Sequence, residues 1–256
     1  MTIAKADFIE GIAKGMAVLE SFDTERQRLN ATLAAERAGL TRAAARRHLL
    51  TLAHLGYLET DGSYFWMAPK VLRFSGSYLA SSRLPRALQP TLNRLAAQTG
   101  ESFSAVVLDG EEVVIVARSG SAGAAARVLA YGLHLGARLP AHATSTGRVL
   151  LAAMSPAALA GWLRSQPLHR LTPQTITQAR LLRQRIAQVR KSDYCFASEE
   201  HELGVQALAV PLRDMQGRTA AALNVVLSSG RHQEEAVRRD LLPLLFDAAR
   251  EVRALL

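Results

Sequence analysis

Residues 37–58 read RAGLTRAAARRHLLTLAHLGYL, and this stretch decides the fold of the first part of the chain. It holds four arginines and two histidines but no acidic residue. Gly39 is suited to end one helix, because glycine readily adopts left-handed backbone angles, and Thr41 is suited to cap the next. A basic helix directly after such a tight turn is typical of a helix-turn-helix module, whose second helix enters the major groove of DNA.

The residues around this stretch complete a winged helix-turn-helix. The spacing predicts helices over residues 10–22 and 31–38 in front of the basic helix. Residues 57–66 predict two short strands joined by an Asp-Gly turn, and Pro69 ends the module. The apolar positions that recur at helical spacing are Ile12, Met16, Leu19 and Phe22 in the first helix and Ala45, Leu49 and Leu52 in the third. We therefore expect a DNA-binding domain over residues 1–69.

Six residues are candidates for contact with DNA. Arg42 and Arg46 fall on the exposed side of the basic helix, where we expect them to approach the groove, and Thr41 is placed to bind a phosphate. Arg47 allows two interpretations, a contact to the DNA backbone or an internal salt bridge that only stabilises the module. Ser63, in the wing, is expected at the minor groove or the backbone. The predicted set is Thr41, Arg42, Ala43, Arg46, Arg47 and Ser63.

The rest of the chain predicts a linker and a second domain, since 256 residues are natural for two domains. Residues 70–83 resemble a helix with a mixed surface, which we interpret as the linker and a dimer contact. Residues 84–256 mix strands and helices, which favours an α+β domain whose sheet is covered by helices. The expected strands are Ser104–Leu108, Val113–Ala117, Val128–Tyr131, Gln206–Arg213 and Thr219–Leu227. The expected helices include Thr144–Met154, Pro156–Arg164, Ile176–Ser192 and Glu234–Leu256, the last kinked by Pro243.

Composition limits the class of protein. The formal net charge of +9 favours an acidic partner such as nucleic acid. The single cysteine, Cys195, excludes an internal disulfide and favours a reducing compartment. No run approaches the roughly 18 apolar residues of a membrane span, and the first residues do not resemble a signal peptide. We therefore expect a cytoplasmic protein without a membrane partner.

A second acid-free run covers residues 113–192, with ten arginines and one lysine. Most of these cations are expected on solvated helix faces. Residues 135–148, however, lead small hydroxyl side chains into a predicted helix N-terminus, where free N–H groups and the helix dipole favour a carboxylate or phosphate. One hypothesis is an anionic effector held at Ser145 and Thr146. The alternative is that these residues only cap the helix.

The sequence gives less support for a reactive cysteine, for hydrolysis or for metal binding. Cys195, between two aromatic residues, is interpreted as a buried structural thiol. His142 has no nucleophile or acid to pair with, so it is either a donor in the pocket or a core histidine. The segment Glu199–Glu202 lacks the spacing of a metal site and is interpreted as a solvated turn at the pocket rim. We expect no enzyme, cofactor or metal. Two alternatives to an effector-controlled regulator stay open: a small-molecule enzyme with an accessory winged helix, and an architectural DNA-binding protein without an effector.

Four blocks, in the same order, resemble the IclR-type transcriptional regulators over essentially the whole chain. They are IAKGMAVLESF (12–22), LTRAAARRHLLTL (40–52), GARLPAHATSTGRVLLA (136–152) and EEHELGVQALAVPLRD (199–214). The resemblance implies an N-terminal winged helix, a linker helix that pairs subunits, and a GAF-like effector-binding domain. It implies dimers or dimers of dimers on promoter DNA, with RNA polymerase as a partner of members that activate transcription. The chain is most similar to the branch that controls protocatechuate, p-hydroxybenzoate and β-ketoadipate catabolism.

The resemblance also implies an effector pocket. Effectors of that branch are aromatic or aliphatic carboxylates. Members that bind very small acids carry an aspartate at the position of Ala197, a cysteine at Ala207, and serines at Asn224 and Val226. These departures favour a larger ring with one carboxylate, and either a hydroxyl that binds Asn224 or an Asn224 that satisfies neighbouring backbone. The predicted effector-binding set is Arg138, His142, Thr144, Ser145, Thr146, Ala197, Val205, Ala207, Asn224 and Val226.

Overall fold

The computed structural model describes residues 3–23, 26–119, 133–230 and 233–256 of the chain. It forms two compact units, Met1–Tyr78 and Leu79–Leu256. The boundary falls inside helix α4 (Leu72–Ser81), within the segment for which the sequence predicts a linker. The expected strand Val128–Tyr131 lies outside the described residues.

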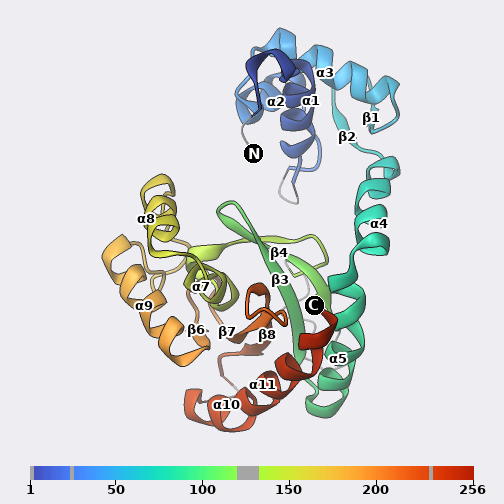
Figure 1. Ribbon diagram of the computed structural model, residues 1–256. Helices are drawn as coiled ribbons and strands as arrows, with labels where there is room; N and C mark the ends of the chain where they lie inside the picture. The colour runs from blue at the N-terminus through green and yellow to red at the C-terminus, as the bar shows by residue number, and fades with distance from the viewer. Residues whose placement is uncertain (1–2, 24–25, 120–132, 231–232) are drawn as a thin grey trace. The chain divides into compact units, whose positions relative to one another are not determined.

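Three helices and a β-hairpin make up the N-terminal unit (Figure 1). The capping signals act as expected. Gly39 ends the second helix with φ +65°, and the Thr41 hydroxyl accepts a hydrogen bond from the N–H of Ala44, at 3.2 Å, at the start of the third. The elements are η1 (Lys5–Asp7), α1 (Glu10–Glu20), α2 (Ala31–Ala38), α3 (Arg42–His54), β1 (Leu58–Thr60), β2 (Phe65–Met67) and η2 (Pro69–Val71). The predicted winged helix-turn-helix is confirmed.

The core of this unit differs from the sequence expectation in one helix. Ala45, Leu49 and Leu52 of α3 are buried as predicted, but α1 packs inward through Val18, while Ile12 and Met16 are exposed. Each residue of an α-helix is rotated by about 100° from the one before it, so Met16 lies about 160° around the helix from Val18. Ile12 and Met16 therefore face away from α2 and α3, whereas Leu19 and Phe22, at the end of the predicted stripe, are partly buried against the core.

One antiparallel sheet of six strands, in the order β5-β4-β3-β8-β7-β6, forms the centre of the C-terminal unit (Figure 1). Its strands are β3 (Ser102–Asp109), β4 (Glu112–Arg118), β5 (Arg138–Pro140), β6 (Cys195–Ser198), β7 (Val205–Arg213) and β8 (Thr219–Ser228). The predicted hairpins β3–β4 and β7–β8 are confirmed. The pairing of β3 with β8 joins them into one sheet and makes β8 a central strand.

Helices cover both faces of this sheet. On one face, α5 and α11 bury Leu92 and Leu245 against strand residues such as Phe103 and Leu208. On the other, α7, α8 and α9 bury apolar side chains against Val106, Ile115 and Cys195. The helices are α5 (Arg83–Thr99), α7 (Ser145–Ala152), α8 (Pro156–Ser165), α9 (Ala179–Ser192), α10 (Glu234–Asp240) and α11 (Leu242–Glu251), with short turns η3 (Ala141–Ala143) and η4 (Val252–Leu255). The α+β prediction is confirmed.

Two helices depart from their predicted bounds. The long C-terminal helix expected to kink at Pro243 is broken at Leu241 into α10 and α11, since proline lacks the N–H that would continue the hydrogen-bond ladder. Helix α9 begins at Ala179 rather than Ile176. In the described ranges, no helix combines the length and the apolar character that crossing a membrane requires.

Candidate functional site

The first two turns of α3 carry a basic exposed face. Thr41, Arg42, Ala43, Arg46 and Arg47 are all exposed, whereas Ala45 and Leu49 of the same helix are buried. The Thr41 hydroxyl uses its oxygen to cap the helix, which leaves its O–H free to donate. These are the positions that a recognition helix presents to base edges and phosphates. The structure therefore brings the predicted residues of α3 together on one surface.

The internal salt bridge considered for Arg47 is not formed with any residue in the described ranges. Another arginine does take such a role in the wing, and the sequence analysis missed it. The guanidinium of Arg28 lies 4.2 Å from the ring centre of Trp66 and 3.3 Å from a carboxylate oxygen of Asp61. Asp61 accepts hydrogen bonds from the N–H groups of Ser63 and Tyr64. Arg28 thus fastens the hairpin tip that holds Ser63.

The cavity at the predicted effector-binding residues begins where β5 passes through η3 into α7. Gly147 brings the first turn of α7 against the main chain of Ala141, so closely that a Cβ on residue 147 would overlap the Ala141 carbonyl group. Thr144 caps α7, because its hydroxyl oxygen accepts from the N–H of Gly147 at 3.1 Å. The whole helix from Ser145 to Leu151 is buried. An amphipathic helix at the surface would have one exposed face. Helix α7 instead lies inside the domain, and its N-terminus lies at a cavity.

Ser145 is the polar group at this helix start that lacks a partner. Its side chain is 1% exposed, and its hydroxyl has no hydrogen-bond partner among the described residues. The capping role that the sequence left open for Ser145 and Thr146 is performed by Thr144 instead. Buried hydroxyl groups are nearly always hydrogen-bonded. A donor left free beside the N–H groups of a helix N-terminus is suited to an anionic ligand.

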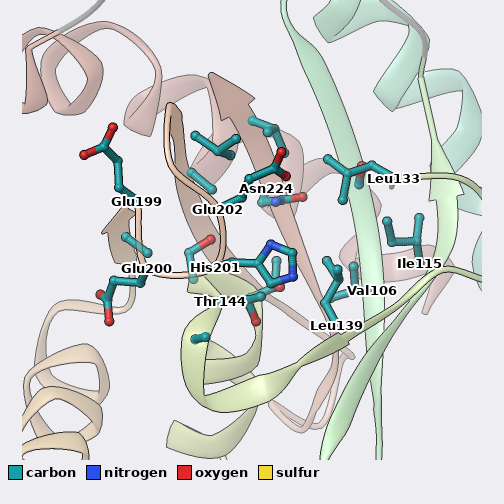
Figure 2. Close-up of a pocket in the computed structure, with 18 residues that line it drawn as sticks. Val106, Ile115, Leu133, Leu139, Thr144, Glu199, Glu200, His201, Glu202 and Asn224 are labelled. Atoms are coloured by element: carbon teal, nitrogen blue, oxygen red, sulfur yellow. The ribbon is translucent and has the colours of Figure 1, made fainter. Parts of the chain in front are cut away.

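Eighteen residues line this pocket, and apolar or small side chains form most of its wall (Figure 2). Of the predicted effector-binding residues, eight line it together: Thr144, Ser145, Thr146, Ala197, Val205, Ala207, Asn224 and Val226. The other lining residues are Ser104, Val106, Ile115, Leu133, Leu139, Ala143, Glu199, Glu200, His201 and Glu202. Neighbouring strands bring most of the wall residues together, because Ala207 pairs with Val226 and with Ala197, and Ser104 pairs with Asn224.

Two residues of the predicted effector-binding set, Arg138 and His142, do not line this pocket. Arg138 is exposed and ion-paired with Asp109 and Glu112, so its charge is already neutralised outside the pocket. His142 is buried, and its Nε2 lies 3.0 Å from the carbonyl oxygen of His169. Burial lowers the pKa of His142, which keeps the ring neutral. His142 is therefore the core histidine of the two interpretations.

A buried ion pair behind the pocket was not found by the sequence analysis. Arg148, 0% exposed, donates to both carboxylate oxygens of Glu200 and, through Nε, to the carbonyl oxygen of His142 at 3.0 Å. Glu200 Oε2 also accepts from the N–H of Ile176, and its carbonyl oxygen accepts from the Thr175 hydroxyl at 2.6 Å. Arg148 therefore ties the start of α7 to the loop that follows β6. The acid-free run around Arg148 hid this partner, which lies 52 residues further along the chain.

The segment Glu199–Glu202 lines the pocket, as the sequence predicts for a rim, but only Glu202 of its four residues is exposed. Glu200 is buried by Arg148, and Glu199 accepts from the N–H of Gly204 and the hydroxyl of Ser229. Figure 2 shows both carboxylates directed away from His201, whose ring projects toward Val106 and Leu139. Burial lowers the pKa of His201, so the ring in the pocket is neutral near pH 7. The segment thus turns the carboxylates of Glu199 and Glu200 away from the neutral His201 ring, while Glu202 stays exposed at the pocket.

Metal binding has no suitable arrangement of side chains in the described part of the chain. No group of His, Cys, Asp and Glu there has the geometry to hold a metal ion. Cys195 is buried, and burial raises the pKa of its thiol, as predicted for a structural cysteine. Trp162 is a packing residue, since its indole N–H donates to the carbonyl oxygen of Gly110 at 3.0 Å.

Comparison with known proteins identifies both units. Residues 11–62 match the IclR helix-turn-helix domain, and residues 76–254 match the bacterial transcriptional regulator IclR C-terminal domain. The sequence is 52% identical to two proteins of Acinetobacter baylyi, in each case over 254 residues, or 99% of this chain. One is the Pca operon regulatory protein, of which 91% is covered. The other is the p-hydroxybenzoate hydroxylase transcriptional activator, of which 94% is covered.

A solved structure resembles the C-terminal unit. It is the inducer-binding domain of the transcription factor PobR from Acinetobacter, a double mutant in complex with 3-hydroxybenzoic acid. The two are 49% identical, with a TM-score of 0.64 over 67% of this chain and 98% of that one. A DNA-binding module at one end and an effector-binding domain at the other, each matched by its own family, confirm the resemblance seen in the sequence. The chain belongs to the IclR family of bacterial transcriptional regulators.

Proposed function

We propose that this regulator responds to a small aromatic carboxylate bound at the N-terminus of α7. The observation that carries the proposal is the unpartnered hydroxyl of Ser145, buried at the mouth of a helix whose first N–H groups face an apolar cavity. A carboxylate there would accept from Ser145 Oγ and from the N–H groups of Ser145 and Thr146. Thr144 assists by holding the helix start in place.

The walls of the pocket favour a ring over a shorter acid. Val106, Ile115, Leu139 and Val226 offer apolar contact, and Ala197 and Ala207 leave room above the sheet. The relatives named for p-hydroxybenzoate hydroxylase and the Pca operon, and the related domain bound to 3-hydroxybenzoic acid, support an effector such as p-hydroxybenzoate or protocatechuate, with β-ketoadipate as an aliphatic candidate.

Binding of a ring is expected to displace the side chain of His201. The cavity has a volume of about 60 Å³, whereas a cavity of about 150 Å³ holds benzene. The imidazole of His201 projects into the space between Thr144 and Leu139 (Figure 2). An effector that turns this side chain or shifts its loop would bind one conformation of the domain better than another, which is the condition for control by a ligand.

The DNA side of the proposal assigns the contacts to α3 and the wing. Arg42 and Arg46 read base edges, Thr41 and Arg47 bind phosphates, and Ser63 at the wing tip touches the backbone or minor groove, with Ala43 close to the bases. Residues 1–69 act as the DNA-binding domain, residues 70–83 as the linker and residues 84–256 as the effector domain. The working form is a dimer or a dimer of dimers in the cytoplasm, with RNA polymerase as a further partner if the protein activates transcription.

A thermal-shift panel tests the effector class. The purified full chain is mixed with p-hydroxybenzoate, protocatechuate, β-ketoadipate, benzoate and glyoxylate. Ligand at about 100 times its dissociation constant adds roughly 2.7 kcal/mol of stability, so a true effector gives a clear rise in melting temperature. A rise with glyoxylate alone, or with none of the acids, would contradict the proposal. Turnover of an acid would favour an enzyme, and ligand-independent DNA binding without sequence preference would favour an architectural protein.

Two matched serine variants separate the two sites. Ser145→Ala removes one hydrogen bond to the carboxylate and should weaken effector binding about tenfold or more, since bonds to charged groups contribute about 1.5–3 kcal/mol. Promoter binding by the effector-free variant should be unchanged. Ser63→Ala should leave effector affinity as it is and weaken DNA binding. Equal effects of the two variants in either assay would show that the sites are wrongly assigned.

A further inference from the structure

The sheet wall of the pocket contains two polar side chains that the carboxylate site does not use. Among the described strand residues that line the cavity, Ser104 on β3 and Asn224 on β8 are polar, and the rest are alanine, valine, isoleucine and leucine. Ser104 and Asn224 are directly opposite each other in the antiparallel register. Opposed residues of an antiparallel pair project from the same face, with Cβ atoms about 4.5–5.5 Å apart. They therefore form one polar patch in an apolar wall.

The side chain of Asn224 contains a buried oxygen without a hydrogen-bond partner among the described residues. This oxygen is Oδ1, and the residue as a whole is 8% exposed. The amide does not serve nearby backbone, because β8 is paired on both sides, with Asn224 opposite Ser104 on β3 and Ala209 on β7. Asparagine is also a poor residue for the interior of a central strand. Neither packing nor strand formation accounts for it, and a ligand that meets the amide does.

We propose that Asn224, with Ser104 opposite it, selects aromatic acids that carry a ring hydroxyl. This inference rests on the proposed aromatic effector. The carboxylate is bound by α7, and the ring hydroxyl reaches the strand wall and donates to the Asn224 amide oxygen. A phenolic hydroxyl both donates and accepts, so it satisfies the amide in either orientation of its oxygen and nitrogen. The Ser104 hydroxyl provides a second partner for the same group.

The proposal predicts that the pocket binds benzoate more weakly than hydroxybenzoates. An acid without the hydroxyl covers the amide with a C–H edge and leaves a buried polar group without water or partner. The expected penalty is roughly tenfold to a hundredfold in affinity. Pocket size alone would discriminate poorly, because a hydroxyl adds little volume to the ring.

The test compares hydroxylated and fluorinated acids by isothermal titration of the full chain. 4-Fluorobenzoate resembles 4-hydroxybenzoate in shape but cannot donate a hydrogen bond. We expect 4-hydroxybenzoate or 3-hydroxybenzoate to bind roughly tenfold to a hundredfold more tightly than 4-fluorobenzoate or benzoate. Asn224→Leu, similar in volume, should bring this ratio close to one, because the hydroxylated acids lose their partner and the other two acids no longer leave a buried amide unpaired. Ser145→Ala should weaken all four acids together and preserve the ratio.

The possible outcomes separate a failure of the proposed function from a failure of the role assigned to Asn224. If no aromatic acid binds the wild-type chain, the proposed function fails and the inference with it. If all four acids bind equally well, or if Asn224→Leu keeps the wild-type ratio, the effector class stands and the role of Asn224 is wrong. Ser104→Ala is the second variant, in case Asn224→Leu does not fold. It should narrow the affinity ratio between hydroxylated and non-hydroxylated acids, and an unchanged ratio overturns the proposal.

Discussion

Replacing Glu200 by glutamine removes the negative charge that neutralises Arg148 at the back of the effector pocket. The side chain of Arg148 is 0% exposed, whereas that of Glu200 is 11% exposed. Glutamine keeps the shape of glutamate and one acceptor oxygen, so one of the two hydrogen bonds to the guanidinium can persist. The cation itself cannot escape to solvent, because α7 is buried along its length.

The expected loss of stability follows from this burial. Removing one partner of a buried ion pair costs about 3–5 kcal/mol, because the remaining charge is left uncompensated in a medium of low polarity. The retained hydrogen bond and the slight exposure of residue 200 place Glu200→Gln at the lower end, about 3 kcal/mol. For a domain of this size that corresponds to a fall in melting temperature of roughly 6–12 °C.

Tryptophan fluorescence isolates the relevant transition. The chain has two tryptophans, Trp66 in the N-terminal unit and Trp162 in the C-terminal unit. In a Trp66→Phe background, Trp162 alone reports, and its buried indole should change strongly when the C-terminal unit unfolds. Urea titrations of this background, with and without Glu200→Gln, give the change in the free energy of unfolding. Two-unit chains are not expected to unfold in one step, so a probe confined to one unit is needed.

Glu251→Gln is the matched control. Glu251 pairs with Arg94 on the surface, where the two side chains are 54% and 51% exposed. Such pairs contribute about 0–1 kcal/mol. Glu200→Gln should also weaken effector binding, because the Arg148 pair holds the loop that carries His201, whereas Glu251→Gln should not. A stability loss below 1 kcal/mol for Glu200→Gln, matching the control, would refute the reasoning.

Three further predictions address the helix start, pH and DNA. Gly147→Ala should sharply lower effector affinity and stability, since its Cβ overlaps adjacent main chain, whereas Gly161→Ala, with open space around it, should be neutral or stabilising in the same assays. Burial lowers the pKa of His142 below its ordinary 6.5, so the unfolded chain binds a proton that the folded chain does not bind. The free energy of unfolding should therefore decrease as the pH falls below about 7, and His142→Gln should reduce this decrease. Arg42→Ala and Arg46→Ala should each change site preference by about 1–3 kcal/mol in a binding-site selection, and uniform weakening across sequences would identify phosphate contacts instead.

Local chemistry explains what the sequence by itself determined. The Gly39 stop, the Thr41 cap, the two hairpins of the C-terminal unit and the exposed basic face of α3 each depend on residues a few positions apart. Capping, helical periodicity and tight turns act over such distances, so they can be predicted from a linear pattern. Eight of the ten predicted effector residues line one pocket, because the family resemblance supplied the long-range placement that periodicity does not.

Only the tertiary structure decided which of the polar residues act together. Arg138 lies next to the predicted pocket in sequence but is turned outward to Asp109 and Glu112, whereas Arg148, ten residues on, turns inward to Glu200. Ser104 and Asn224 stand 120 residues apart and meet because β3 pairs with β8. A charged or polar side chain points toward its hydrogen-bond or ion-pair partner. Which partner lies within reach depends on the order of the strands and on the close contact at Gly147. Burial then makes these pairings strong, since unpaired polar groups are costly away from water.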